Sequence, residues 1–588
     1  MEAQRIQDIE DYCQNVPQTH NFRKKLVPDG LRPKIVMIMR ELLMLIENEG
    51  YLPNRDVRKI WSKYKYQPKK VQMAKIYYEW IDNEEIEQND ILESFLKIKQ
   101  CRSISGVSVV TVFLSAFPNG QTFSCKWDCK YCPKEPNMPR SYLFEEPGVL
   151  RAIQNDFDCV RQMYCRLDMY RINGTPRDKL EVLILGGTIH SYPNEYLEEY
   201  MRDIFYAANT YPEKDSRERL TLQEEQYINE TSKSGRVIGI TVETRPDCIT
   251  RSELIKFRRW GVTRVQIGVQ HTDDQILRNA NRGCYLRHTI RAIKLLRESC
   301  FKFDIHLMPN LPGSTPEIDK RMIDYVLANL HPDQVKMYPT EVVPFTDLLE
   351  DYKAGTYKPY PNEDLEDVVI YYKERVHPWI RNNRIIRDIP NEYIIDGVKS
   401  ANQRQEFHKL MKSLGKKCHC IRCREAGRHP EYSPYDGEMV VRHYEASGGH
   451  EFFLSWESKD REAIFGFSRL RLSKDAGMIF PELRRTAMIR ELHVYGHTTA
   501  VADKRKKNIQ HLGIGKRLMS KAEQIARRYN ILKMSVIAGI GTRKYYEKLG
   551  YHKEETFMVK DILDYKPIIF IGFLFYLVIF LKLLSIFV

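Results

Sequence analysis

The sequence has little that would mark a secreted or disulfide-stabilised protein. Its first residues, MEAQRIQDIEDYCQ, contain no apolar run of signal-peptide length, so we expect no secretory signal. The sequence contains thirteen cysteines, an odd number, and seven of them are scattered along the chain. This scatter argues against a disulfide framework and favours a reducing compartment, in which clustered cysteines bind metals.

The sequence also has no internal repeat and no long low-complexity segment. Hydrophobic residues make up 43% and charged residues 29%, an ordinary globular balance that predicts several domains in a chain of 588 residues. The net charge of +14 suits an anionic partner such as a nucleic acid, an anionic lipid or a phosphate-rich cofactor. A solvated basic surface without a partner is the alternative.

Residues 1–95 are expected to form a helical, basic region. Residues 35–47 carry apolar side chains at helical spacing. The tract 55–75 interleaves eight lysines and arginines with Trp61, Tyr64 and Tyr66. Cations for phosphates and rings for bases suit a nucleic-acid surface, and a solvated helix face is the alternative.

Apolar runs long enough to cross a bilayer are absent except at the C-terminal end. Residues 567–588 are nearly all apolar, with Lys582 as the one charge, and a spanning helix needs about 20 residues. We therefore expect a single-pass tail anchor that places the protein on the cytoplasmic face of an intracellular membrane, the endoplasmic reticulum or the mitochondrial outer membrane. A buried terminal helix is the alternative.

Short apolar strands alternate with longer helical segments in the middle of the chain. The expected strands are 107–114, 180–187, 236–243, 263–270, 301–308 and 333–339. Their continuous apolar runs are typical of parallel strands covered on both faces. They predict an α/β fold with a partial (β/α)6 barrel over 96–345, followed by a cysteine-rich linker over 346–437 and an α+β domain over 438–562.

The first cysteine group consists of Cys125, Cys129 and Cys132, spaced Cys-x3-Cys-x2-Cys. A structural zinc site needs four ligands, whereas three cysteines on a 4Fe–4S cluster leave one iron without a protein ligand. That iron can bind S-adenosylmethionine (SAM) through its amino and carboxylate groups. The group follows the first strand, so it is expected at the barrel mouth, where active sites gather.

Two further motifs are predicted at the same mouth. Gly186 and Gly187 end the second strand, where they let the backbone approach a ligand closely. Glu243 and Arg245 end the third strand, where a carboxylate can hold a ribose hydroxyl. A tight turn and a buried ion pair are the structural alternatives.

The C-terminal domain contains QHLGIGKRLM at 510–519. Its glycines let backbone N–H groups converge on a pyrophosphate at a helix N-terminus, as in the acetyl-CoA loop of GNAT acetyltransferases, which this domain resembles. Tyr545 and Tyr546 then lie where a phenol can meet the thioester. Two packed tyrosines are the alternative.

The second cysteine group consists of Cys418, Cys420 and Cys423. Its position between two predicted domains, away from the barrel mouth, favours a structural zinc ion. The fourth ligand is expected among four histidines: His419, His429, His443 and His493.

Together these features make the chain similar to the catalytic, third subunit of Elongator over about residues 85–560. The resemblance is carried by CKYCP, LGGT, GITVETRPD, IGVQ, NRG, MPNLPG, VKMYPT, RDIP, RELHVYG, GIG and GTRKYYEKLGY. It implies an enzyme that uses acetyl-CoA to form 5-carboxymethyluridine at the wobble uridine of tRNA. It also implies the tRNA anticodon stem-loop as substrate, with other Elongator subunits or a second copy of the chain as partners.

The resemblance further implies roles for individual residues. The first cysteine group holds the cluster, a deoxyadenosyl radical takes a hydrogen from the acetyl methyl group, the carbon radical adds to uracil, and the thioester is hydrolysed. The implied SAM-site residues are Gly186, Gly187, Glu243 and Arg245. The implied acetyl-CoA-site residues are Lys179, Glu491, Leu492, His493, Val494, Gln510, Gly513, Ile514, Gly515, Lys516 and Tyr546. The implied catalytic residues are Lys179, Tyr545 and Tyr546.

Two other functions remain open from the sequence. A protein lysine acetyltransferase needs only the GNAT domain, and a non-enzymatic tRNA-binding scaffold needs neither active site. The chain also departs from the family pattern after the glycine pair, where Ile189–His190 replaces the usual phenylalanine, and in the short spacing between its first two cysteines.

Overall fold

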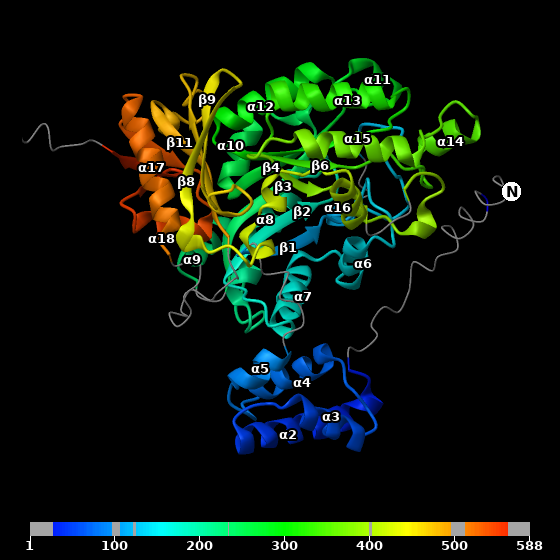
Figure 1. Cartoon of the computed structure of the whole chain (residues 1–588), viewed down its shortest axis with the longest axis vertical. Helices are drawn as coiled ribbons and strands as arrows, with labels where there is room; N and C mark the ends of the chain where they lie inside the picture. Colours follow the sequence, from blue (N-terminus) through cyan, green and yellow to red (C-terminus); the bar gives the residue numbers. More distant parts are fainter. Residues whose placement is uncertain are drawn as a thin grey trace, which may run out of the picture.

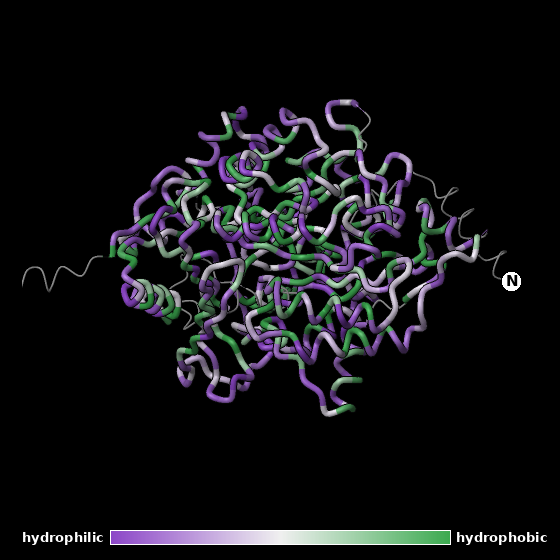
Figure 2. Tube along the Cα trace, turned by 90° about the horizontal axis from the view of Figure 1, so that it is seen from above, coloured by the Kyte–Doolittle hydropathy of each residue, from purple (hydrophilic) through white to green (hydrophobic). Residues whose placement is uncertain are grey.

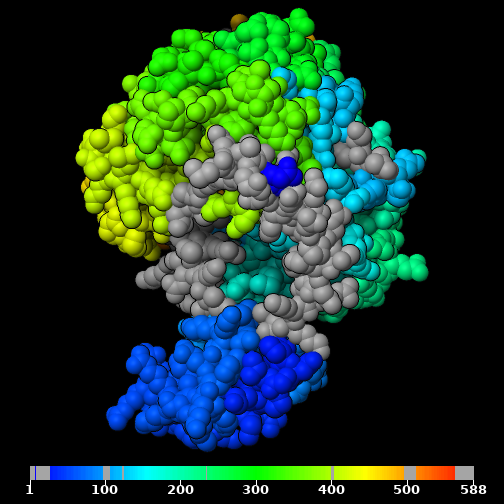
Figure 3. Space-filling model, turned by 90° about the vertical axis from the view of Figure 1, so that its right-hand side faces the viewer, coloured from blue at the N-terminus to red at the C-terminus, as the bar shows by residue number. Residues whose placement is uncertain are grey.

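In the computed structural model the chain forms a helical N-terminal region, a curled parallel sheet and a second, mainly antiparallel sheet (Figure 1). The structure describes residues 7, 27–96, 106–121, 125–232, 235–398, 403–495 and 512–562. In the space-filling view the helical region is a lobe below the body that holds the two sheets (Figure 3).

Four helices form the N-terminal region. They are α2 (Arg32–Glu49), α3 (Asn54–Lys63), α4 (Lys70–Asp82) and α5 (Asp90–Leu96). Their apolar faces enclose a core that includes Ile38 and Leu42, and Trp61, Tyr64 and Tyr66 pack against that core. The aromatic rings of the basic tract therefore stabilise the helices, while the basic residues of α3 stay exposed.

The central sheet contains seven parallel strands in chain order. They are β1 (Ser108–Phe113), β2 (Lys179–Leu185), β3 (Arg236–Thr244), β4 (Val262–Gln270), β5 (Lys302–Leu307), β6 (Gln334–Met337) and β7 (Arg381–Arg384). Helices lie along its outer face and around its mouth: α6 (Pro147–Gln154), α7 (Cys159–Ile172), α8 (Asn194–Thr210), α9 (Leu222–Thr231), α10 (Arg251–Arg259), α11 (Asp274–Asn279), α12 (Leu286–Glu298), α13 (Pro316–Tyr325), α14 (Asp347–Lys353), α15 (Asn362–Arg375) and α16 (Gln403–Ser413).

The prediction of a partial (β/α)6 barrel is corrected by the seventh strand. β7 lies in the segment predicted as a linker, and its sequence is Arg-Asn-Asn-Arg. Arg381 of β7 pairs with Gln334 of β6 in parallel register. The sequence did not reveal this strand because an edge strand with polar side chains on its inner face has no continuous apolar run.

The two faces of the central sheet differ in polarity. On β2, Leu180, Val182 and Ile184 are buried in the core beneath the helices, whereas Glu181 and Leu183 line a central cavity. Hydrophobic segments gather inside the molecule and hydrophilic ones dominate its periphery (Figure 2). The interior of this half-barrel is therefore an open site, unlike the packed interior of a closed eight-stranded barrel.

The second sheet has the strand order β13-β14-β12-β11-β10-β9-β8. Its strands are β8 (Glu438–Ala446), β9 (Gly449–Glu457), β10 (Ile464–Leu472), β11 (Thr486–Val494), β12 (Lys533–Val536), β13 (His552–Glu554) and β14 (Phe557–Asp561), with helices α17 (Ile514–Arg528) and α18 (Arg543–Glu547). β11 and β12 are parallel and pair only from Thr486 to Ile489. Because β11 continues to Val494, the two strands diverge and open the sheet after Ile489.

The second sheet packs against the amino ends of the barrel strands. Arg490 of β11 donates two hydrogen bonds to the carboxylate of Asp333, just before β6, at 2.6 and 2.7 Å. Both residues are fully buried. Although burial alone would raise it, Arg490 and then Arg469 hold the pKa of Asp333 far below its usual range. Close approach also requires glycine, because a Cβ on Gly539 would lie 1.9 Å from the carbonyl oxygen of Ile238.

Within the part of the chain that the structure describes, no helix is both long enough and apolar enough to cross a membrane. The helix predicted over 567–588 lies outside the described residues.

Replacing Asp333 by Asn tests the contact between the two sheets. Asp333→Asn removes one of the two buried carboxylates that pair with Arg490, leaving Glu451 alone, and it also takes an anion from the buried Arg469. We therefore expect the free energy of unfolding to fall by about 3–5 kcal/mol in urea denaturation at pH 7. The folded-state pKa of Asp333 lies below the unfolded value of about 3.9. The ion pair therefore stabilises the protein above about pH 4, and its contribution is lost as the pH falls toward the folded-state pKa.

The control is Asp367→Asn, which removes an exposed carboxylate paired with Lys320 and should change stability little. Equal stability losses in the two variants would contradict the importance of the Asp333–Arg490 pair.

Candidate functional site

The first cysteine group lies in the loop that follows β1, at the carboxyl ends of the barrel strands, as predicted. The backbone N–H of Lys130 anchors this loop by donating to the Ala280 carbonyl oxygen at 3.1 Å. Among the described residues, only the second cysteine group gathers three potential ligand atoms within 4.8 Å. The sulfurs of Cys125, Cys129 and Cys132 are not all within that distance of one another. A 4Fe–4S cluster does not require them to converge on one point, because each cysteine binds a different iron.

Two buried arginines point at Cys129. Nη1 of Arg245 lies 3.7 Å from the Cys129 sulfur, and Nη1 of Arg282 lies 3.5 Å from it. Burial raises the pKa of the Cys129 thiol, but Arg282 and then Arg245 outweigh it and bring the pKa below its usual value. The surroundings therefore favour the thiolate, which is the form that binds iron.

The glycine pair after β2 is required by both backbone conformation and space. Gly186 and Gly187 have φ angles of +150° and +81°. A Cβ on Gly187 would lie 3.0 Å from the carbonyl oxygen of Arg140, in the cysteine loop, and a Cβ on Gly186 would lie 2.9 Å from Leu114 Cβ. The pair thus allows the ends of β1 and β2 and the cysteine loop to approach one another closely.

Glu243 ends β3 with its carboxylate in the central cavity. The hydroxyl of Tyr142 donates to its Oε2 at 2.9 Å, and Nδ1 of His306 lies 3.2 Å from its Oε1. Burial, and next the charge of Lys336, lower the pKa of His306 well below its usual value, so this imidazole is neutral near pH 7. Glu243 is therefore held by two groups, one from the loop that follows β1 and one from β5.

One cavity of about 800 Å³ runs along the inside of the half-barrel. At the mouth it is lined by Tyr131, Tyr142 and Glu243, and at the opposite end by Glu491 and Tyr546 of the second domain. The cavity thus joins the loop that holds the first cysteine group to the residues predicted to bind acetyl-CoA. No feature of the sequence placed these two sites in one chamber.

The walls of the cavity combine polar and apolar side chains. Gln266 donates to Asp304 at 3.2 Å, and Lys336 donates to Gln266. Burial lowers the pKa of Lys336 to about 8, although Glu243 and Asp304 oppose the shift. A chamber with such walls suits a polar substrate, and Lys336 retains a proton near pH 7 that it can donate.

Three of the four predicted residues of β11, Glu491 to His493, line the inner end of the cavity. Nε of Arg469 donates to Glu491 at 2.9 Å, and Lys302 also faces this carboxylate. Burial opposes ionisation of Glu491, yet Lys302 and then Arg469 hold its pKa below the usual range. Leu492 and His493 also line the cavity, and Val494 ends the strand.

The predicted acetyl-CoA loop precedes α17. Gly513 caps this helix with a φ of +74°, and Ile514 begins it. A Cβ on Gly515 would lie 2.6 Å from the hydroxyl oxygen of Tyr545, so the helix start and this ring are in close contact. Lys516 is exposed in the first turn. Gln510 lies outside the described residues.

The two predicted catalytic tyrosines have different surroundings. Tyr546 is buried and lines the cavity, whereas Tyr545 is 39% exposed beside the start of α17. Burial, and then the neighbouring Tyr545, raise the pKa of Tyr546, so its phenol keeps its proton near pH 7. Tyr546 is therefore better placed to act on a group inside the chamber.

Lys179 begins β2 at the amino end of the barrel, on the side of the second domain. Burial lowers the pKa of this amine. Lys179 is not among the residues that line the cavity. The structure therefore places it near the acetyl-CoA side and away from the cysteine loop, without bringing it into the chamber.

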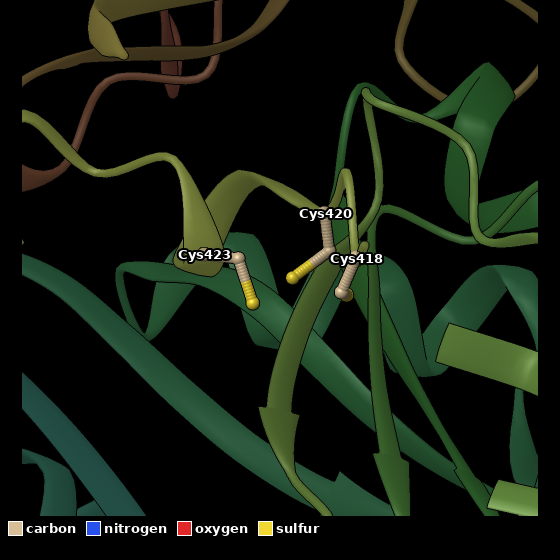
Figure 4. A group of neighbouring side chains, drawn as sticks. All are labelled: Cys418, Cys420 and Cys423. Atoms are coloured by element: carbon tan, nitrogen blue, oxygen red, sulfur yellow. The ribbon is translucent and has the colours of Figure 1, made fainter. Parts of the chain in front are cut away.

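The sulfurs of Cys418, Cys420 and Cys423 lie within 4.8 Å of one another, gathered around one space (Figure 4). Nε2 of His408, from α16, lies 3.8 Å from the Cys423 sulfur. This histidine was not among the four candidates from the sequence. Of those, His429 contacts the Cys423 carbonyl oxygen, His443 contacts His450, and His493 stacks on Phe467 in the cavity.

Sequence reasoning missed Tyr142, Arg282, His306, Lys336 and His408. A signal was present for two of them, because polar and apolar residues alternate along β5 and β6, and His306 and Lys336 belong to the polar set. Such residues point into the chamber when the strand is inward-facing at that position. The other three come from loops or a helix whose approach depends on the fold.

Comparison with protein families matches most of the chain. Residues 167–326 match the Radical SAM superfamily, residues 332–416 match the Radical_SAM C-terminal domain, and residues 420–551 match the Acetyltransferase (GNAT) family. The second of these matches includes β7, in agreement with the seven-stranded sheet.

Individual relatives align over nearly the whole length. The tRNA uridine(34) acetyltransferase of Methanocaldococcus infernus is 36% identical over 552 residues, covering 89% of this chain and 100% of that protein. Elongator complex protein 3 of Bos taurus is 35% identical, covering 80% of this chain and 87% of that protein. The solved structure of the M. infernus Elp3 lacking residues 1–46 superposes with a TM-score of 0.66 at 34% identity, covering 78% of this chain and all of that one.

These relatives also correct the predicted location. The bovine relative is a protein of the Elongator complex, and no described helix supports a membrane span. The predicted tail-anchored location at an intracellular membrane is wrong. It relied on apolar composition over 22 residues, which satisfies the length requirement of a spanning helix without demonstrating one.

Replacing Gly187 by Ala tests the close approach at the mouth. The added Cβ meets the Arg140 carbonyl and the φ of +81° is strained for alanine, so the cysteine loop must move. We expect SAM affinity, measured by anaerobic titration calorimetry, to fall by about 10-fold to 100-fold.

The matched control is Gly355→Ala, which has a φ of +71° and no atom within 4 Å of the added Cβ. It should lower stability without changing SAM affinity. Unchanged affinity in Gly187→Ala would show that this glycine does not shape the ligand site.

Proposed function

This chain belongs to the family of tRNA uridine(34) acetyltransferases and Elongator complex protein 3, and we propose that it uses acetyl-CoA to modify the wobble uridine of tRNA. The observation that carries the proposal is the single cavity that joins the cysteine loop to the acetyl-CoA residues. A reaction between an acetyl group and a base needs both in one chamber. The product we propose is 5-carboxymethyluridine.

At the mouth, Cys125, Cys129 and Cys132 would hold a 4Fe–4S cluster, and Gly186, Gly187 and neighbouring groups would bind SAM. When bound, these groups supply a one-electron cleavage that generates a carbon-centred radical. The fit rests on the spread of the three sulfurs and on the buried arginines, which favour thiolate ligands. Glu243 would accept a hydrogen bond from a ribose hydroxyl of SAM. This requires that Tyr142 or His306 moves away from the Glu243 carboxylate.

At the inner end, the thioester must lose its acyl group to water. Tyr546 keeps its proton near pH 7 and lines the chamber, so it is positioned to donate to the departing sulfur. Glu491 is ionised and lines the same end, so it can orient the attacking water. The β11–β12 divergence after Ile489 leaves room for an extended ligand between the strands.

The tRNA is proposed to approach the mouth from outside. The wobble base has to leave the stack of the anticodon loop, because the chamber admits a base and not a folded loop. Arg384 and Arg387 line the outer part of the cavity and can meet phosphate oxygens. The exposed basic residues of α3 add a second cationic surface on the N-terminal lobe. We also propose other Elongator proteins as partners, because the bovine relative is Elongator complex protein 3.

Analysis of modified nucleosides tests the proposal. The full chain is purified anaerobically, reconstituted with iron and sulfide, and incubated with SAM, a low-potential reductant, acetyl-CoA and unmodified tRNA. We expect 5-carboxymethyluridine in the digested tRNA. We expect none with Cys129→Ala and about 100-fold less with Tyr546→Phe, which removes the proton donor.

Cys165→Ala is the control for cysteine loss, because Cys165 lies on α7 outside both cysteine groups. If Cys129→Ala forms the nucleoside at the rate of the parent chain, the radical reaction is excluded. If acetylated protein lysines appear instead, the lysine acetyltransferase hypothesis is favoured.

We further propose that Cys418, Cys420, Cys423 and His408 bind a structural zinc ion. Three gathered sulfurs with an imidazole nitrogen 3.8 Å from one of them make a four-ligand set of the kind zinc prefers. The site lies between the edge strand β7 and the second domain, because Ile421 donates to the Ile380 carbonyl oxygen at 3.0 Å. Zinc there would fix the second domain against the barrel edge.

Metal analysis of His408→Ala tests the zinc site. We expect about one zinc per chain in the parent, a clear loss in the variant after dialysis against a chelator, and a lower melting temperature. His443→Ala serves as control, since His443 contacts His450 on the β8–β9 hairpin. Full zinc retention in His408→Ala would remove this histidine from the ligand set.

A further inference from the structure

Arg282 is a buried cation without a matching carboxylate. It is 6% exposed, its Nη1 points at the Cys129 sulfur at 3.5 Å, and its Nη2 donates to the Gly268 carbonyl oxygen at 2.7 Å. Its Nε has no hydrogen-bond partner, and no carboxylate forms an ion pair with it in the described part of the chain. A buried, uncompensated charge is costly, so this guanidinium indicates an anion at Cys129.

Arg245 differs because its charge is compensated. It is 1% exposed and contacts the same sulfur at 3.7 Å. Its Nε and Nη2 also donate to the carboxylate of Asp247 at 3.0 and 3.2 Å. The guanidinium stacks over the ring of Trp127, inside the cysteine loop, at 4.2 Å. Nη2 also donates to the Arg282 carbonyl oxygen at 2.8 Å, so the two arginines are held together.

The charges of Arg282, Arg245 and Asp247 thus surround Cys129, the proposed cluster ligand. Asp247 forms its ion pair with Arg245 and offsets much of that charge, whereas it acts on Arg282 only from a longer distance, without a hydrogen bond. The reduction potential of an iron–sulfur cluster depends on nearby charge and on hydrogen bonds to its sulfurs. Reduction adds one electron to the cluster and makes it more negative, so nearby cations favour the reduced state.

We propose that Arg282 and Arg245 raise the reduction potential of the cluster held at Cys129, and that Asp247 limits this effect. The inference rests on the proposed function, since it requires that the cysteine loop binds a 4Fe–4S cluster. In the redox step the cluster takes one electron from a low-potential one-electron donor, and no bond in the protein forms or breaks. The arginines are positioning residues that act through Cys129 and need not touch a substrate.

Two substitutions predict shifts of opposite sign. Arg282→Gln removes a cation and should make the potential more negative. We expect the ratio of reduced to oxidised cluster at a fixed solution potential to fall at least tenfold, which is about 59 mV for a one-electron couple. Asp247→Asn uncovers the charge of Arg245 and should make the potential more positive. Its shift should be smaller, because the Asp247 side chain is 19% exposed and partly screened by solvent.

The experiment is a redox titration of the full, reconstituted chain followed by electron paramagnetic resonance, without tRNA or acetyl-CoA. Iron and sulfide content is measured for each variant. Arg278→Gln is the charge-matched control, since Arg278 is exposed on α11 and contacts Gln275. Its potential should equal that of the parent. Arg282→Lys keeps the charge and should recover part of the shift.

Opposite shifts in Arg282→Gln and Asp247→Asn support the inference. Parent-like potentials in both, or shifts of the same sign, overturn it. If Arg282→Gln fails to retain a full cluster, Asp247→Asn decides alone, and an unchanged potential there overturns the inference. Failure of the parent chain to assemble a 4Fe–4S cluster would instead contradict the proposed function.

Discussion

The buried ion pair between Asp333 and Arg490 is the contact on which the arrangement of the two sheets depends. It joins the start of β6 to the middle of β11, so the residue next to Arg490, Glu491, faces the interior of the half-barrel. A buried pair of this kind tolerates little displacement, because separating the charges takes from each its shortest ion pair and leaves only the longer ones to Glu451 and Arg469, with no solvent to replace it. The position of the residues predicted to bind acetyl-CoA relative to the cysteine loop therefore follows from this pair and from the close backbone contact at Gly539.

A polar interior is the second constraint. Charged and amide side chains, together with apolar ones, line the chamber where a closed barrel would have a packed apolar core. Their cost is reduced by mutual contacts, such as those of Gln266 with Asp304 and of His306 with Glu243. The stability of the barrel has to come from its outer face, where apolar strand residues pack under the helices. Because the outer face supplies the apolar packing, the inner face of the sheet is free to carry polar side chains that contact substrates.

The two cysteine groups have the same number of ligands but opposite geometry. The second group converges on one space with an imidazole beside it, which suits a single ion. The first group is spread along a loop and faces two guanidinium groups, which suits a larger, anionic cluster. From the sequence, the two groups could be told apart only by the segments that flank them. In the structure they differ physically, because two arginine guanidinium groups lie beside the first group.

Local pattern determined much of this protein. Six parallel strands, the cysteine loop after the first of them, the glycine pair and the order of the second domain all follow from apolar runs and turn residues. The sequence did not predict β7, because its polar residues face the chamber. The location predicted from residues 567–588 was wrong, because composition alone does not establish a membrane span. Only the tertiary structure brought His408 to Cys423, Arg282 to Cys129 and Glu491 to the cavity that holds Glu243. These contacts join segments far apart in the chain, and they depend on how the sheets pack, which the spacing of residues along one strand or helix does not encode.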